Sequence, residues 1–111
     1  MKTKVGLRLI RRVVQQIIDR YHPQRVVLFG SYAHGRPSQD SDVDLLVVMK
    51  SKKGPVDRAI EVSKSLYFYP FPMDILVRTP QEIHRRLRIG DAFFEDILSH
   101  GKVLYEHRPK P

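Results

Sequence analysis

The residues most suited to chemistry are a glycine–serine pair, Gly30-Ser31, and two acids, Asp42 and Asp44, that follow after ten intervening residues. A third acid, Asp74, interrupts a later apolar run. Glycine lets a phosphate approach the backbone without a Cβ in the way, and the amides that open the next helix point towards the anion. Carboxylates are preferred ligands of divalent cations. Together these residues predict a site that holds a nucleoside triphosphate through a divalent metal.

The acids lie at the starts of predicted strands. Asp42 and Asp44 open an apolar run, residues 43–48, and side chains at positions i and i+2 of a strand share a face, roughly 6 to 7 Å apart. Asp74 lies inside a second apolar run, residues 71–77. A buried carboxylate costs several kcal/mol unless it is paired or bound to metal. We therefore expect Asp74 either to lie beside Asp42 and Asp44 or to pair with an arginine.

The combination of motifs is more informative than each motif alone. Gly30-Ser31 by itself would more simply be a turn with Ser31 as a helix N-cap, and Asp42 and Asp44 could be solvated acids at a strand entrance. Three carboxylates within about 4 Å of one another, however, repel by roughly 4 kcal/mol per pair at an effective dielectric constant of 20. Such a cluster is tolerable mainly when divalent cations occupy it, so the acids predict the metal.

Apolar periodicity predicts the elements that position these residues. A helix with apolar residues at helical spacing ends before Pro23. A strand then leads into Gly30, and further strand and helix segments follow with short connections up to a last helix. The predicted segments are helix 10–21, strand 25–29, strand 43–48, helix 56–67, strand 71–77, a helix from Thr79 towards Gly90, and a helix ending at Gly101. This order predicts an α/β fold, a small mixed β-sheet with helices packed on it and the active site at strand ends.

Length and composition limit the architecture. The 111 residues can bury one modest core, so we expect a single domain over residues 1–106 and a frayed C-terminal tail over 107–111. The absence of cysteine excludes disulfides and thiolate metal sites. The first residues are too charged for a signal peptide, and no apolar run reaches membrane-spanning length. These features predict a cytoplasmic protein.

The motifs resemble those of a known family. Gly-Ser-x-Ala-x-Gly at residues 30–35, followed by Ser-Asp-x-Asp-Leu-Leu-Val at residues 41–47 and by Asp74, is similar to the minimal nucleotidyltransferase (MNT) domains of the DNA polymerase β superfamily. The ending, residues 97–105, also resembles the terminal helix and short strand of the family. The resemblance covers nearly the whole chain and implies the nucleotidyltransferase fold. Members of this family are small prokaryotic proteins that commonly act beside a helical HEPN protein, as antitoxin to a ribonuclease toxin. Some transfer AMP from ATP to a tyrosine of that partner.

The resemblance also implies a role for each motif residue. Asp42 and Asp44 would bind two Mg²⁺ ions, and Asp74 would hold the second ion beside the acceptor hydroxyl. Gly30-Ser31 would cradle the β- and γ-phosphates of ATP, the substrate. Arg36 would add positive charge near the phosphates, although a solvated loop arginine is the simpler alternative.

Three functions remain open at this stage. The domain adenylylates a HEPN-type partner, or it neutralises a partner by occlusion as a non-catalytic binding module, or it modifies RNA ends or a small molecule. Twenty basic against twelve acidic side chains would attract nucleic acid, a triphosphate or an acidic partner. Short basic runs are usually solvated faces, so nucleic-acid binding is not favoured. Homo-oligomerisation also remains open.

Overall fold

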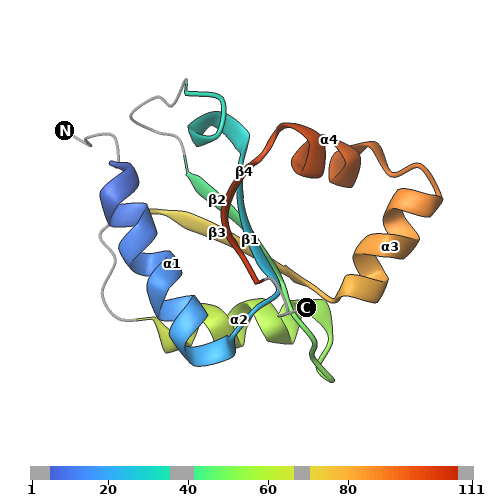
Figure 1. Cartoon of the computed structure of the whole chain (residues 1–111). Helices are drawn as coiled ribbons and strands as arrows, with labels where there is room; N and C mark the ends of the chain where they lie inside the picture. The colour runs from blue at the N-terminus through green and yellow to red at the C-terminus, as the bar shows by residue number, and fades with distance from the viewer. Residues whose placement is uncertain (1–5, 36–41, 67–70, 108–111) are drawn as a thin grey trace.

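The computed structural model describes residues 6–35, 42–66 and 71–107. Helices and strands follow one another along the chain in the order that the sequence predicts (Figure 1). In chain order the elements are α1 (Leu7–Tyr21), β1 (Arg25–Phe29), the 3₁₀ helix η1 (Gly30–Tyr32), β2 (Val43–Val48), α2 (Pro55–Ser65), β3 (Met73–Arg78), α3 (Pro80–Arg88), α4 (Ala92–His100) and β4 (Lys102–Glu106). None of the described helices combines the length and the apolar character needed to cross a bilayer.

The strands form one mixed sheet in the order β3-β2-β1-β4. β1 is antiparallel to both β2 and β4, whereas β2 and β3 are parallel. The end of β1 and the starts of β2 and β3 therefore lie at the same end of the sheet. This topology gathers the predicted site residues, because the glycine turn follows β1 and the acids open the other two strands.

Helices cover both faces of the sheet, with α1 and α2 on one face and α3 and α4 on the other (Figure 1). Side chains alternate along β2, as in any strand. Val43 and Leu45 enter the core beneath α1 and α2, whereas Leu46 packs with Phe94 on the opposite face. Asp44 comes between Val43 and Leu45, so it faces the side of the sheet that carries α3 and α4.

The predicted start of α3 is confirmed in atomic detail. The backbone N–H of Glu82 donates to the Thr79 hydroxyl at 3.1 Å, and the Thr79 N–H donates to a Glu82 carboxylate oxygen at 2.8 Å. This reciprocal capping box satisfies two backbone groups that the first helical turn would otherwise leave free. Gly90, with a φ of +78°, separates α3 from α4 as expected.

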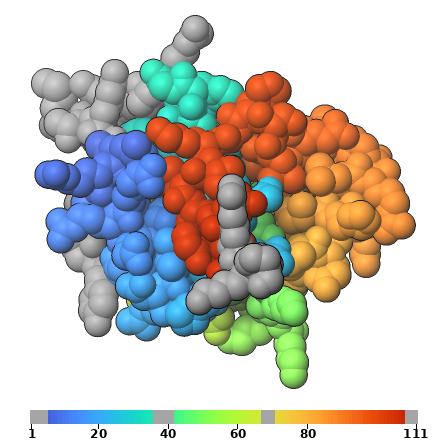
Figure 2. Space-filling view, in the orientation of Figure 1, coloured from blue at the N-terminus to red at the C-terminus, as the bar shows by residue number. Residues whose placement is uncertain are grey.

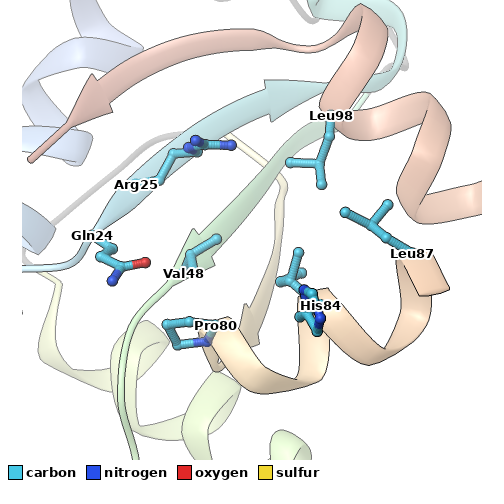
Figure 3. A pocket seen from close by; sticks show the side chains of 8 residues that line it. Gln24, Arg25, Val48, Pro80, His84, Leu87 and Leu98 are labelled. Carbon is cyan, nitrogen blue, oxygen red and sulfur yellow. The ribbon is translucent and has the colours of Figure 1, made fainter.

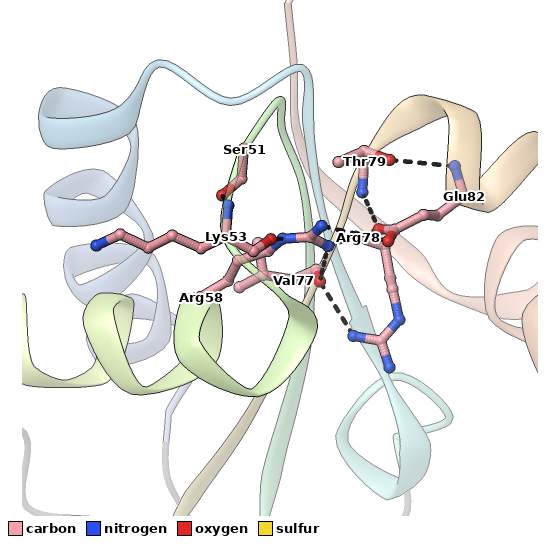
Figure 4. A network of polar contacts seen from close by, with 7 residues as sticks. All are labelled: Ser51, Lys53, Arg58, Val77, Arg78, Thr79 and Glu82. Atoms are coloured by element: carbon pink, nitrogen blue, oxygen red, sulfur yellow. Dashed lines mark hydrogen bonds and ion pairs between the residues drawn. The ribbon is translucent and has the colours of Figure 1, made fainter.

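A buried arginine joins α2 to the end of β3 and the start of α3 (Figure 4). Arg58 is 5% exposed, and its guanidinium contacts both carboxylate oxygens of Glu82, at 2.6 and 3.2 Å. Its Nε donates to the Lys53 carbonyl at 2.6 Å, and Nη1 lies 3.4 Å from the Val77 carbonyl. The guanidinium of Arg58 therefore connects the loop after β2 to the end of β3 and the start of α3.

Candidate active site

The turn after β1 begins with a glycine that has no room for a side chain. Gly30 has a φ of +75°, a left-handed conformation that costs other residues about 1 to 2 kcal/mol. A Cβ built on Gly30 would collide with the carboxylate oxygen Oδ2 of Asp44. The amides of Ala33 and His34 donate to the Gly30 carbonyl at 3.1 and 3.3 Å and close the 3₁₀ turn. The turn thus brings bare backbone directly against an acid of β2.

Two acids from neighbouring strands lie side by side at the same end of the sheet. Asp44 and Asp74 are register partners in the parallel β2–β3 pair, and Asp42 comes directly before β2. The predicted neighbourhood of Asp44 and Asp74 is therefore confirmed. No arginine of the described ranges forms an ion pair with Asp74, so the alternative of an arginine partner finds no support there.

The burial of the acids differs from the expectation. Asp74 is exposed, because β3 is an edge strand whose start is open to solvent, and the prediction of a buried Asp74 was wrong. Asp42 is also exposed, whereas Asp44 is partly buried. Burial, followed by the charges of Asp74 and Asp42, raises the pKa of Asp44. The acids therefore form a coupled anionic group centred on Asp44, and a cation would relieve its repulsion.

The donor chemistry of this group suits magnesium. Mg²⁺ takes oxygen ligands and is usually held by one or two carboxylates together with substrate phosphates and water. Across residues 6–35, 42–66 and 71–107, no three His, Cys, Asp or Glu side chains surround one point as a complete protein cage. A magnesium ion shared with phosphate needs no such cage. The neighbouring carboxylates Asp44 and Asp74 therefore match this ion in donor type, and phosphate and water would supply its other ligands.

The other predicted phosphate contacts are only partly described. Ser31 follows Gly30 in η1, which packs against β2, and it is partly buried. Ser31 therefore belongs to the same turn that brings Gly30 against Asp44. Arg36 lies outside the described residues, as do residues 108–111 of the expected tail, so the phosphate contact of Arg36 and the frayed tail both stay predictions.

A cavity elsewhere in the molecule does not have this chemistry. It has a volume of about 230 Å³ and lies at the opposite end of the sheet, lined by Arg25, Val48, His84, Leu98 and their neighbours (Figure 3). The space-filling view shows the surface hollowed between α3 and β4 (Figure 2). Neither a glycine nor a carboxylate residue lines this cavity. The acids and the glycine turn therefore define the candidate active site.

Comparison with known proteins identifies the family of this chain. Residues 7–103 match the family described as the nucleotidyltransferase domain. The chain belongs to this family. The match confirms the resemblance to MNT domains that the motifs indicated.

Curated relatives of this nucleotidyltransferase domain come from Methanocaldococcus jannaschii. "Putative protein adenylyltransferase MJ0604" is 29% identical over 101 residues, which cover 86% of this chain and 94% of the relative. "Putative protein adenylyltransferase MJ0141" is 31% identical over 77 residues, which cover 69% of this chain and 74% of the relative. The similarity therefore extends over most of both proteins.

Two solved structures share the architecture of the nucleotidyltransferase domain. One is described as a putative nucleotidyltransferase from Sulfolobus solfataricus, with a TM-score of 0.64, 22% identity, and coverage of 91% of this chain and 80% of the other. The second is a chain from a mutant of the toxin-antitoxin MntA-HpeT, with a TM-score of 0.57, 20% identity, and coverage of 95% and 76%. These likenesses confirm the predicted α/β nucleotidyltransferase fold.

The nucleotidyltransferase domain also places aromatic rings beside the acids, which was not expected from the sequence. Phe29 is the register partner of Asp44, and its ring lies 5.9 Å from that of Phe93 in α4, measured between centroids. Helical periodicity separates Phe93 from its core-facing neighbour Phe94, but it does not reveal which strand residue the ring meets. This contact depends on how α4 crosses the sheet.

Neutralising Asp44 is expected to leave metal-free protein at least as stable as the wild type. A raised pKa means that the ionised carboxylate is less favourable in the folded than in the unfolded state, so Asp44→Asn removes an unfavourable charge. With ATP and Mg²⁺ the wild type should become more stable than Asp44→Asn, because a ligand stabilises only the protein that binds it. Thermal melts of both proteins in chelator and with MgATP check this. A clearly lower melting temperature for Asp44→Asn in chelator would identify Asp44 as a structural residue.

Proposed function

We propose that this nucleotidyltransferase domain transfers AMP from ATP to a hydroxyl group of a partner protein, and that it acts in this way as the antitoxin of a HEPN-type ribonuclease toxin. The observation that carries the proposal is that Asp44 lies beside Asp74 on the neighbouring strand and directly against Gly30. The names of the curated relatives support protein adenylylation. The toxin-antitoxin neighbour supports a toxin partner, and its HEPN type follows from the resemblance of the motifs.

Each group at the site has a task in the reaction. The acceptor hydroxyl oxygen attacks the α-phosphorus of ATP, a new P–O bond forms, and the α–β phosphoanhydride bond breaks to release pyrophosphate. Asp42, Asp44 and Asp74 would hold two Mg²⁺ ions, which supply Lewis-acid stabilisation of the phosphate charge. The Gly30-Ser31 turn would cradle the β- and γ-phosphates, with the Ser31 hydroxyl as a donor. Asp74 receives the proton of the acceptor hydroxyl.

The exposure of Asp74 favours a macromolecular acceptor. Asp74 lies at the start of an edge strand and is open to solvent, so a hydroxyl on a folded protein can reach it. Gly30 and Asp44 lie towards the middle of the sheet, where the smaller nucleotide is held. The partner would then supply the surface that carries the acceptor hydroxyl.

The test incubates the purified chain with ATP labelled at the α-phosphate, Mg²⁺ and the protein encoded beside it in the genome. The Asp42→Asn/Asp44→Asn double variant serves as the matched control. We expect label on the neighbouring protein with the wild type and none with the double variant, because the variant loses two of the three carboxylates. Toxin activity should fall in parallel with labelling.

The same experiment separates the other functions. A neighbouring protein that is inhibited equally by wild type and double variant, without label, would identify a non-catalytic binding module. Label on added RNA or on a small molecule, with none on the neighbouring protein, would identify an enzyme that modifies RNA ends or a small molecule. Either result would contradict protein adenylylation.

A further inference from the structure

A half-exposed aromatic ring stands beside the acidic site. Phe93, at the second position of α4, is 52% exposed, whereas its neighbour Phe94 is 5% exposed and belongs to the core. Phe93 makes edge-to-face contacts with two rings, Phe29 at 5.9 Å with an interplanar angle of 89° and Phe94 at 5.3 Å with an angle of 84°. Such contacts fix the position of a ring beyond simple burial. Phe93 is therefore a supported ring with part of its surface open.

The backbone beneath this ring is also fixed. The Asp91 carboxylate caps α4 and accepts the N–H groups of Phe93 at 3.0 Å and Phe94 at 3.3 Å. An N-cap of this type contributes about 1 kcal/mol to helix stability. The exposed ring is thus presented by the ordered first turn of a helix.

The aromatic pair lies on the nucleotide side of the site. Phe29 is the last residue of β1, directly before Gly30, and it is the register partner of Asp44. Directly opposed residues of an antiparallel pair point to the same face, so Phe29 and Asp44 share a face. Asp74 lies on β3, two strands from β1, which is about 10 Å at the usual strand spacing. The rings therefore border the glycine turn, away from the edge where the acceptor enters.

We propose that Phe93, supported by Phe29, stacks against the nucleobase of the bound nucleoside triphosphate. This inference rests on the proposed function, since it requires the triphosphate to lie at Gly30-Ser31 and the acids. The base is joined to the α-phosphate through the ribose, so it extends from the acids towards neighbouring surface. On the β1 side this surface is the open part of Phe93. Every base has a π-face, so stacking adds affinity without selecting one base.

The test compares two ligands that differ in having a base. Calorimetry measures binding of ATP and of inorganic tripolyphosphate, each with Mg²⁺, to the full chain and to Phe93→Ala. We expect the dissociation constant for ATP to rise about tenfold, as for loss of one base–aromatic stack, while that for tripolyphosphate stays unchanged. Phe93→Trp should retain ATP affinity, and Phe93→Leu should resemble Phe93→Ala although it keeps an apolar side chain over Phe29. Ile89→Ala, at an apolar side chain that is 66% exposed, is the control and should change neither constant.

Each contrary result has a definite meaning. Equal weakening of both ligands, or no weakening of ATP, would overturn the stacking role. A rise only in the KM for the acceptor protein would also overturn it and would place the acceptor on Phe93. If the wild type bound neither ligand, the proposed nucleotide site would fail and the stacking role with it. If the tenfold difference were found without label on a partner protein, the stacking role would stand and protein adenylylation would fail.

Discussion

Replacing Gly30 by alanine is expected to reduce nucleotide transfer by at least about 100-fold. The added Cβ would collide with Asp44 Oδ2, and a displacement of about 1 Å at a reacting centre can cost a factor of this size. Transfer of labelled AMP measures the activity, and calorimetry with MgATP shows whether nucleotide binding is lost as well.

Gly35→Ala is the matched control for backbone strain. Gly35 also has a positive φ, +70°, but a Cβ built there meets nothing within 4 Å. Both variants should lose about 1 kcal/mol of stability through the left-handed backbone, and only Gly30→Ala should lose transfer. An equal loss of transfer in both variants would mean that strain, and not the contact with Asp44, explains the effect.

The fold was largely predictable because its local signals agree with one another. The Thr79 cap and Glu82 start α3, Gly90 ends the α3 segment, and the apolar stripe of α1 stops before Pro23, all as the sequence indicates. Each of these start and stop signals acts within a few residues, so it can be recognised without knowledge of the tertiary structure. Strand order and register depend on contacts distant in sequence, and these required the structure.

The candidate site was predictable in its acids but not in their burial. The sequence left Asp74 either beside Asp42 and Asp44 or paired with an arginine, and the β2–β3 register places it beside Asp44. The exposure of Asp74 depends on β3 being an edge strand, which an apolar run cannot reveal. The position of Phe93 follows from the path of α4 across β1, and that path is set by packing rather than by local sequence. The sequence therefore did not predict the features that depend on contacts between distant parts of the chain, which are the exposure of Asp74 and the position of Phe93.

The largest stability effect is expected at the buried ion pair of Arg58 and Glu82. Arg58→Met should lower the free energy of unfolding by about 3 kcal/mol, the lower end for breaking a buried pair, because the Glu82 side chain is 31% exposed and regains some water. Two backbone carbonyls would also lose their guanidinium partner. Urea unfolding at pH 7 measures the loss. Arg25→Met is the control, since the Arg25–Glu106 pair is 38% and 40% exposed and should contribute less than about 1 kcal/mol.

The pH dependence of the same pair separates its charge from its packing. Hydrogen bonding to Arg58 holds the pKa of Glu82 below its usual 4.5. The ionised pair therefore contributes fully above pH 4.5, and its contribution is lost as the pH falls through the lowered pKa of the folded state. Glu82→Gln should be less stable than the wild type at pH 7, and the difference should shrink as the pH is lowered from 4.5. Urea unfolding of both proteins along that pH series checks this. A difference that stayed constant across the series would show that Glu82 acts through its packing and its helix cap, with no contribution from its charge.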